Sequence, residues 1–260
     1  MTTDLSNFCG LAIQLDSEKP ALTSGEGLNF SKPGVRTLEQ MREVLLDKAI
    51  NAPQELYYMY RDVYEISDKP LLEKHSLRFD VTMIKPDALG RELMKTAGHY
   101  HPGDFGELYE VVAGRCYCLM QKCLASDYQA IEEVIVVEAA AGDKIVIPPG
   151  FGHILINPGP KHLVTSNWVS SRFSSEYELY KKAQGAAYFV TGPADKPQFM
   201  PNPNFKKLPG IKFVRPARVI EKFGLSSPAP MYPLIRQDTG KLDFLNRPLD
   251  FDYSDIFVKP

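Results

Sequence analysis

The pattern of hydrophobic and polar positions divides this chain into three stretches. From residue 77 onward, short β-branched and aromatic runs are separated by Gly, Pro and Asp, which is typical of short strands joined by turns. The pattern predicts strands at 78–85, 91–98, 107–113, 115–121, 132–139, 144–148, 153–157, 163–170 and 187–191. About nine short strands with few helices fit a jelly-roll barrel of two sheets. The expected fold class is therefore all-β, with the barrel at residues 76–191.

The stretch before the barrel, residues 1–75, is mixed and is expected to be a partly helical extension. The Thr-x-x-Gln sequence that begins at Thr37 has the spacing of a capping box, and the apolar positions after it predict a helix over 38–49. Pro53 predicts the first turn of a second, short helix that continues to Tyr60.

The stretch after the barrel, residues 192–260, is rich in proline. Repeated prolines interrupt regular structure, so this stretch is expected to be an extended arm. Its scattered apolar residues indicate that the arm lies on the barrel or on a partner subunit. One short helix is expected just before it, over 175–184.

Composition and charge exclude several classes of protein. Apolar residues make up 44% of the chain and charged residues 24%, values that are ordinary for a globular protein. A net charge of −2 without a basic stripe argues against a nucleic-acid or membrane-surface partner. The first ten residues lack the pattern of a signal peptide, and no apolar run approaches membrane-spanning length, so we expect a cytoplasmic protein.

Two histidine-containing segments carry the candidate chemistry. In a strand, residues two apart project to the same face, so His99 and His101 could bind one ion. Glu107 would add an oxygen ligand from the next strand, and His153 follows a Pro-Gly turn on a later strand of the same wall. Three imidazoles and one carboxylate suit a divalent transition metal, and an octahedral ion would keep two positions open for substrate or water. The pattern predicts a catalytic metal site.

The spacing of these residues resembles the two signatures of the cupin superfamily. The first signature reads His99-x-His101, Glu107 and Gly114 in this chain. The second reads Gly142, Pro148-Pro149-Gly150, His153 and Asn157. The gap between His101 and Glu107 is longer than in most cupins. The barrel therefore resembles a cupin with a lengthened ligand loop.

A narrower resemblance covers residues 75 to 180. The run Lys95-Thr96-Ala97-Gly98-His99-Tyr100-His101-Pro102 is similar to that of the cupin-type phosphoglucose isomerases of archaea and some bacteria. This resemblance implies interconversion of glucose 6-phosphate and fructose 6-phosphate, an aldose–ketose isomerisation. It also implies one divalent metal per subunit, held by the four residues above. Iron is the first expectation, with manganese, nickel or zinc as alternatives.

The resemblance also implies where the phosphate group binds. By position, the hydroxyls of Thr82 and Thr96 and the backbone N–H of Gly98 would hold it, and Lys95 or Arg91 could add charge. In a regular strand Thr96 and Gly98 would point away from the face that carries His99. A bulge at Ala97–Gly98 would relieve this conflict, and glycine is suited to one.

Further positions concern the sugar and the proton transfer. Tyr109 would face the sugar by resemblance, and Tyr177 would preserve a nearby substrate contact. A Tyr and a His of some family members correspond here to Val169 and Ser175. Glu107 is the nearest carboxylate for an enediol route, in which a base moves a proton from C2 to C1. A hydride shift, in which no base touches carbon, is the alternative.

Other functions remain open for the same ligand set. An iron-dependent cupin dioxygenase would use these ligands with oxygen in the open positions, and a non-catalytic sugar-binding cupin would be expected to have lost some of them. A small phosphosugar is the expected ligand. A homodimer is also expected, because a cupin barrel offers exposed edge strands that terminal-strand exchange would cover.

Overall fold

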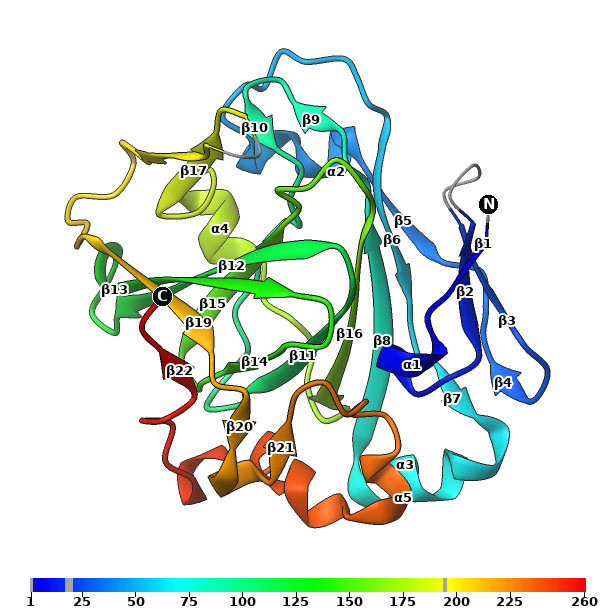
Figure 1. Cartoon of the computed structure of the whole chain (residues 1–260). Helices are drawn as coiled ribbons and strands as arrows, with labels where there is room; N and C mark the ends of the chain where they lie inside the picture. The colour runs from blue at the N-terminus through cyan, green and yellow to red at the C-terminus, as the bar shows by residue number, and fades with distance from the viewer. Residues whose placement is uncertain (1, 17–20, 194–195) are drawn as a thin grey trace.

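The computed structural model describes residues 2–16, 21–193 and 196–260, and its centre is a barrel of two facing sheets (Figure 1). The six-stranded sheet contains, in order, β14 (Lys144–Ile147), β11 (Glu107–Ala113), β16 (Leu163–Ser170), β8 (Leu77–Ile84), β6 (Glu55–Tyr60) and β5 (Gly34–Thr37). The five-stranded sheet contains β15 (Phe151–Ile156), β12 (Arg115–Leu124), β13 (Asp127–Ala140), β19 (Ile211–Pro216) and β22 (Phe257–Val258). One apolar cluster lies between the two sheets. The core of the chain is an all-β barrel of two sheets, as predicted.

Smaller elements surround the barrel. The remaining strands are β1 (Thr2–Asp4), β2 (Ile13–Asp16), β3 (Ala21–Ser24), β4 (Leu28–Asn29), β7 (Tyr64–Glu65), β9 (Ala88–Leu89), β10 (Glu92–Leu93), β17 (Tyr188–Thr191), β18 (Gln198–Pro201), β20 (Val219–Ile220) and β21 (Leu225–Ser226). The α-helices are α1 (Ser6–Cys9), α2 (Leu38–Met41), α3 (Lys69–His75), α4 (Glu178–Lys182) and α5 (Leu234–Gln237). The 3-10 turns are η1 (Arg42–Val44), η2 (Ile66–Asp68), η3 (Glu221–Phe223), η4 (Thr239–Leu245) and η5 (Pro248–Asp250). Within the described ranges, every helix is too short or too polar to cross a lipid bilayer.

Alternation along β8 separates the two faces of the six-stranded sheet. Its odd-numbered residues, from Leu77 to Met83, belong to a second apolar cluster outside the barrel. Its even-numbered residues Arg78, Asp80 and Thr82 have the opposite parity and so face the barrel interior. All three are polar, so this strand brings polar side chains into the barrel.

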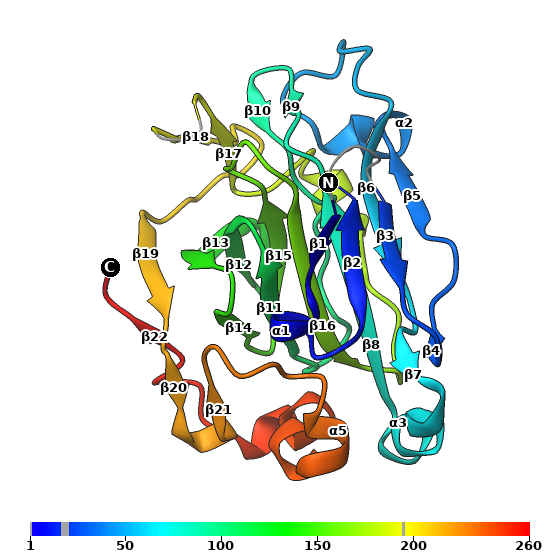
Figure 2. The ribbon, with the colours of Figure 1, turned by 45° about the vertical axis from the view of Figure 1, so that its right-hand side comes forward.

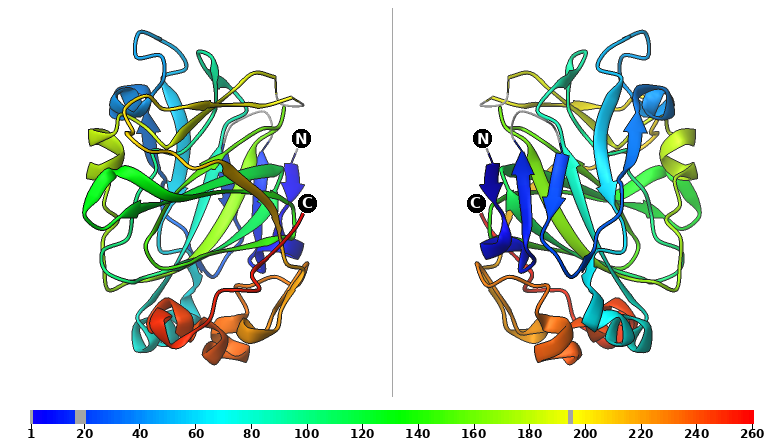
Figure 3. Two further views of the ribbon diagram at one scale, coloured as in Figure 1. Left: turned by 90° about the vertical axis from the view of Figure 1, so that its left-hand side faces the viewer. Right: turned by 90° about the vertical axis from the view of Figure 1, so that its right-hand side faces the viewer.

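The terminal stretches cover the outer face of the six-stranded sheet. In Figure 2, α1 and the strands β1 and β2 lie over β16, and α5 lies at the lower end. The two views of Figure 3 show the C-terminal helical segment at one end of the barrel and the N-terminal strands along its side. Trp168 on β16 is fully buried there, and its indole N–H donates to the carbonyl oxygen of Met231 (3.0 Å). The arm 192–260 contains α5, η3, η4 and η5, and its strand β19 adds to the five-stranded sheet beside β13.

The helix predicted over 38–49 is shorter in the structure. The capping box at Thr37 is present and begins α2, but η1 ends the helical segment at Val44. Beyond that residue, the N–H of Leu46 donates to Oε2 of Glu92 (2.7 Å). This tertiary hydrogen bond replaces the next intrahelical one and holds the chain against β10, on which Glu92 lies.

The second helix, predicted from Pro53 to Tyr60, is wrong. Residues Glu55–Tyr60 form β6, which pairs with β5 on one side and β8 on the other. Aromatic residues have high strand propensity, and the two partner strands satisfy the hydrogen bonds of the backbone on both edges. The six-stranded sheet therefore includes two strands from the stretch before residue 76, where the barrel was expected to begin.

The strand predicted at 91–98 is also largely wrong. Only Glu92–Leu93 are strand, followed by single bridges at Lys95 and His99. Glu92 and Lys95 form an ion pair, although residues three apart lie on opposite faces of a regular strand. Gly98 has a left-handed φ of 80°. The chain is therefore irregular here, and the parity conflict for Thr96 and Gly98 does not arise.

Candidate active site

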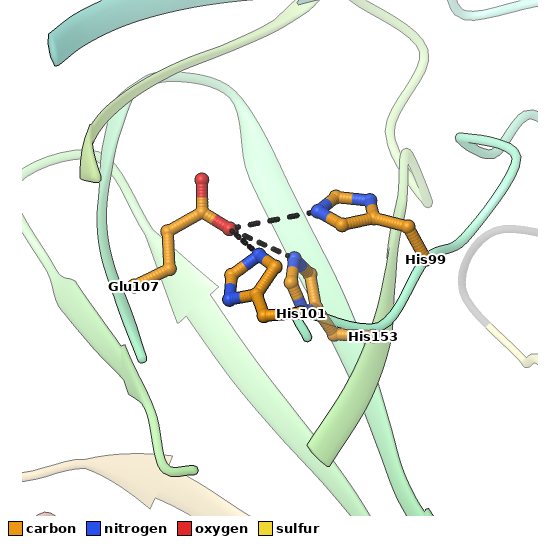
Figure 4. A group of neighbouring side chains, drawn as sticks. All are labelled: His99, His101, Glu107 and His153. Carbon is orange, nitrogen blue, oxygen red and sulfur yellow. Dashed lines mark ion pairs between the residues drawn. The ribbon is translucent and has the colours of Figure 1, made fainter. Parts of the chain in front are cut away.

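Four side chains meet inside the barrel. His99 and His101 come from the irregular segment after β10, Glu107 begins β11, and His153 lies on β15. Two backbone hydrogen bonds join His99 and His153: His99 N to His153 O (3.3 Å) and His153 N to His99 O (3.0 Å). The Oε2 atom of Glu107 lies 3.8, 3.3 and 3.1 Å from the Nε2 atoms of His99, His101 and His153 (Figure 4). The predicted cluster is therefore present as a spatial group.

The donor atoms of this cluster fit a cation. One ligand atom from each residue lies within 4.8 Å of all the others. His101 Nε2 and Glu107 Oε2 are buried and form no hydrogen bond with protein atoms. The Nδ1 of His101 lies 3.1 Å from the carbonyl oxygen of Phe105, which can only accept, so Nδ1 carries the proton and Nε2 presents its lone pair. Buried lone pairs that converge without a shared proton suit a divalent transition metal.

The electrostatics of the cluster favour neutral imidazoles at His99 and His153 and an ionised carboxylate at Glu107. Burial, helped by the neighbouring His153, lowers the pKa of His99 to about 3. Burial also lowers the pKa of His153. For Glu107, burial alone would raise the pKa, but contacts with the three histidines hold it well below its usual value. This combination has the charge state that metal ligands require.

Two residues on the inner face of the sheet contact the cluster. The side-chain amide of Asn167 on β16 donates to Oε1 of Glu107 (2.7 Å), and the hydroxyl of Tyr109 on β11 lies 3.2 Å from Nε2 of His153. Burial and the charge of Glu107 raise the pKa of Tyr109 well above its usual value. Tyr109 therefore keeps its proton and can donate a hydrogen bond.

A small cavity of about 40 Å³ lies beside the cluster. Its walls include five of the predicted substrate-contact residues, namely Thr82, Thr96, Gly98, Tyr109 and Tyr177. Val169 and Ser175, which replace a Tyr and a His of some family members, also line it. We call this space the metal-side cavity.

Comparison with known proteins agrees with this geometry. The family model for glucose-6-phosphate isomerase matches residues 35–202, which include the whole cluster and the cavity walls. The chain belongs to this family. It is 27% identical over 140 residues to the glucose-6-phosphate isomerase of Thermococcus litoralis, covering 52% of this chain and 67% of the relative. It is 23% identical over 198 residues to that of Thermococcus onnurineus, covering 75% and 96%. As a member of the family, the chain is an isomerase.

The solved structures with related shapes are more distant. An oxalate oxidase structure aligns with 16% identity and a TM-score of 0.37, covering 52% of this chain and 63% of that one. An oxalate decarboxylase from Bacillus subtilis aligns with 16% identity and a TM-score of 0.34, covering 46% and 27%.

The structure does not place Lys95 in the metal-side cavity. Its ammonium group is buried, pairs with Glu92 and donates to the carbonyl oxygen of Val44 (3.0 Å). The Phe189 ring lies 5.1 Å from the same nitrogen. These contacts use the charge of Lys95 to fix the chain next to Thr96, so a direct contact between Lys95 and substrate, as predicted, is wrong for this conformation.

Two arginines in the metal-side cavity were missed by the sequence analysis. Arg61 and Arg78 both bind the buried carboxylate of Asp80, at 2.5 and 2.9 Å. Burial alone would lower the pKa of Arg61, but Asp80 raises it, so the guanidinium stays charged. Arg78 could have been found from the sequence, because Arg78, Asp80 and Thr82 are two residues apart on one strand and so lie on the same face. Arg61 gave no such signal, because the segment directly before it was predicted to be helical.

Proposed function

We propose that this chain interconverts glucose 6-phosphate and fructose 6-phosphate with one divalent transition metal per subunit. The observation that carries the proposal is the convergence of His99, His101, Glu107 and His153 beside a polar cavity, in a chain of the glucose-6-phosphate isomerase family. Iron is our first choice of metal, with manganese, nickel or zinc as alternatives. We also propose a cytoplasmic homodimer that acts on a small phosphosugar.

The reaction moves hydrogen between C2 and C1, and negative charge develops on the oxygens of those carbons. A divalent ion held by the four ligands would polarise these oxygens and stabilise that charge. In the enediol route from glucose 6-phosphate, the carboxylate of Glu107 takes the C2 proton, the C–H electrons form the C1–C2 double bond, and the electrons of the C1 carbonyl move to O1, which takes up a proton. O2 then loses its proton to form the C2 carbonyl while Glu107 returns a proton to C1. Coordination weakens Glu107 as a base, and the hydride shift remains the competing route.

The remaining side chains would position the substrate. Tyr109 keeps its proton and would donate a hydrogen bond to a sugar oxygen. The Thr82 and Thr96 hydroxyls and the Gly98 N–H would contact the phosphate end, and Tyr177 would cover the sugar. Polar walls that include Arg61 and Arg78 favour a polyhydroxy phosphate over the apolar substrate usual for a dioxygenase.

The test is isomerisation of fructose 6-phosphate by metal-stripped protein. We expect turnover to be lost with the metal and to return when iron, manganese, nickel or zinc is added. His153→Ala should abolish it, whereas His162→Ala should not, because His162 lies outside the cluster. Turnover that survives both chelation and His153→Ala would contradict the proposal. In heavy water, deuterium at C2 of the glucose 6-phosphate formed would identify the enediol route, because a proton held by the Glu107 carboxylate can exchange with solvent before it returns to carbon. Complete retention of the substrate hydrogen is the result expected for the hydride shift.

A further inference from the structure

A second cavity adjoins the metal-side cavity. Its volume is about 650 Å³, and its walls include the cationic residues Arg36, Arg42, Lys48 and Lys181. Ala97, Gly98 and Tyr177 line both spaces. We call this larger space the outer cavity. Most of its lining residues lie before residue 76, in a stretch where the sequence predicted no site residue.

The sizes of the two cavities restrict how a sugar phosphate can bind. A volume of 40 Å³ has room for about three water molecules. Cavities that bind small molecules usually measure several hundred Å³, and the outer cavity lies in that range. A ligand that reaches the four-residue cluster must therefore extend into the outer cavity. Ala97, Gly98 and Tyr177 separate the two cavities. Ala97 and Gly98 have no side chain that could swing aside, so the half-buried side chain of Tyr177 is the one that can rotate to join the two spaces.

The outer cavity has an excess of positive charge, although the whole chain is weakly negative. Four of its lining residues are cationic and two are anionic, whereas the chain has a net charge of −2. Three of the cations are already engaged: Arg42 with Glu39 (2.8 Å), Lys48 with Gln184, and Lys181 with Glu178 (3.5 Å). Among the described residues, Arg36 and Lys48 form no ion pair with a carboxylate. Of these two, Arg36 is the one that contacts Tyr57 and Tyr177, which line the metal-side cavity.

Arg36 is fixed at the boundary between the two cavities. Its Nε donates to the hydroxyl oxygen of Tyr57 (3.1 Å), which also accepts from the backbone N–H of Ala97 (3.2 Å). Its guanidinium carbon lies 5.8 Å from the ring centre of Tyr57 and 5.5 Å from that of Tyr177. Since Nε is the atom used, the two terminal nitrogens remain available for a ligand.

The backbone beside Arg36 offers one more donor. The N–H groups of Thr96, Ala97 and His99 are all hydrogen-bonded, whereas the described residues form no hydrogen bond with the Gly98 N–H. Gly98 lines both cavities, so this N–H lies at their junction. A guanidinium with two available nitrogens and an adjacent free N–H match the oxygens of a phosphate monoester.

We propose that the sugar phosphate spans both cavities and that Arg36 binds its phosphate group together with the Gly98 N–H. This inference rests on the proposed function and deepens it, because it supplies the charge that the cradle of Thr82, Thr96 and Gly98 lacks. Arg61 and Arg78 are weaker candidates, since both are held by Asp80. Arg36 thereby makes the site specific for phosphorylated sugars.

The experiment compares Arg36→Gln with the wild type and with Arg115→Gln, a control whose guanidinium pairs with Glu138 and lies outside both cavities. For fructose 6-phosphate, Arg36→Gln should raise KM about 10- to 100-fold, the range expected for a lost charged hydrogen bond, with kcat nearly unchanged. Arg36→Lys should lie between, and Arg115→Gln should remain within about threefold of the wild type. Circular dichroism and the melting temperature would establish that each variant is folded.

Inorganic phosphate provides a readout that does not depend on turnover. Calorimetry of the metal-loaded protein should show weaker phosphate binding for Arg36→Gln by a similar factor, and unchanged binding for Arg115→Gln. This result is expected even if fructose 6-phosphate is not isomerised, so failure of the proposed function and failure of the inference are distinguishable. Wild-type phosphate affinity in Arg36→Gln, or a loss found in Arg61→Gln instead, would overturn the inference.

Discussion

The side-chain amide of Asn167 donates to Oε1 of Glu107 across 2.7 Å, and Oε2 of the same carboxylate faces the three histidines. The two residues lie on adjacent strands, β16 and β11, near one another in the antiparallel register. Because one oxygen is held by the amide, the orientation of the other is fixed. Asn167 thus orients the carboxylate of Glu107 without being a metal ligand itself.

Asn167→Leu should weaken metal binding while keeping the volume of the side chain. Removal of a hydrogen bond that orients a ligand typically costs 10- to 100-fold in metal affinity, so we expect a loss of about that size. Metal titration of the stripped protein would measure it. Ser166→Ala is the matched control, because Ser166 lies on the opposite face of the same strand and its buried hydroxyl has no hydrogen-bond partner. Equal metal affinity in both variants would contradict the positioning role.

Glu107→Gln should reduce turnover and Glu110→Gln should reduce stability, although both carboxylates lie on β11. We expect Glu107→Gln to reduce turnover about 100- to 10,000-fold, because it removes both a ligand and the proposed base. Glu110 instead pairs with buried Lys144 (2.9 Å) outside the barrel interior. Its substitution should lower the free energy of unfolding by about 3 kcal/mol, because Lys144 would be left buried without a counter-charge. Steady-state kinetics and urea denaturation of each variant would separate these effects.

Lys95→Met should affect stability and not substrate affinity. Removing one partner of a buried ion pair costs about 3–5 kcal/mol, so the free energy of unfolding should fall by that amount. The double variant Glu92→Leu/Lys95→Met should recover part of the loss, since no charge then remains buried alone. Urea denaturation would measure both. A higher KM for fructose 6-phosphate with unchanged stability would instead support direct substrate contact by Lys95.

The sequence was sufficient for the barrel and for its four metal-ligand candidates because both depend on local information. Strand 107–113 and strand 163–170 match β11 and β16 residue for residue, since regular alternation and glycine turns define them. The His and Glu spacing likewise identified the cluster. The cluster forms for a different reason than expected, however, because His99 is aligned by its bridge to His153 and not by a regular strand.

What the sequence could not indicate depends on pairing between distant segments. The residues of β6 were read as helical, and they form a strand because β5 and β8 lie on either side of them. That error also hid Arg61, whose position in the cavity follows from β6. The contact of Arg36 with Tyr57 depends on the register between β5 and β6, which no local pattern encodes.

Gly98→Ala should damage the site through packing. A Cβ at this position would lie 2.5 Å from Cγ2 of Ile154 and 2.7 Å from the ring of Tyr180, and φ is 80°. Gly103→Ala is the control, because Gly103 also has a positive φ, of 60°, but a Cβ there would meet nothing within 4 Å. The left-handed backbone should cost each variant about 1–2 kcal/mol. Overpacking should cost Gly98→Ala about a further 1–3 kcal/mol.

The same clash should reduce the activity of Gly98→Ala. Relief of the contacts with Ile154 and Tyr180 requires the backbone between Thr96 and His99 to move, which displaces both the Gly98 N–H and a metal ligand. We therefore expect a higher KM for fructose 6-phosphate in Gly98→Ala and a KM like that of the wild type in Gly103→Ala. Urea denaturation and steady-state kinetics on both variants provide the measurements. Equal stability and equal KM in the two variants would mean that the close packing around Gly98 does not hold this segment in place.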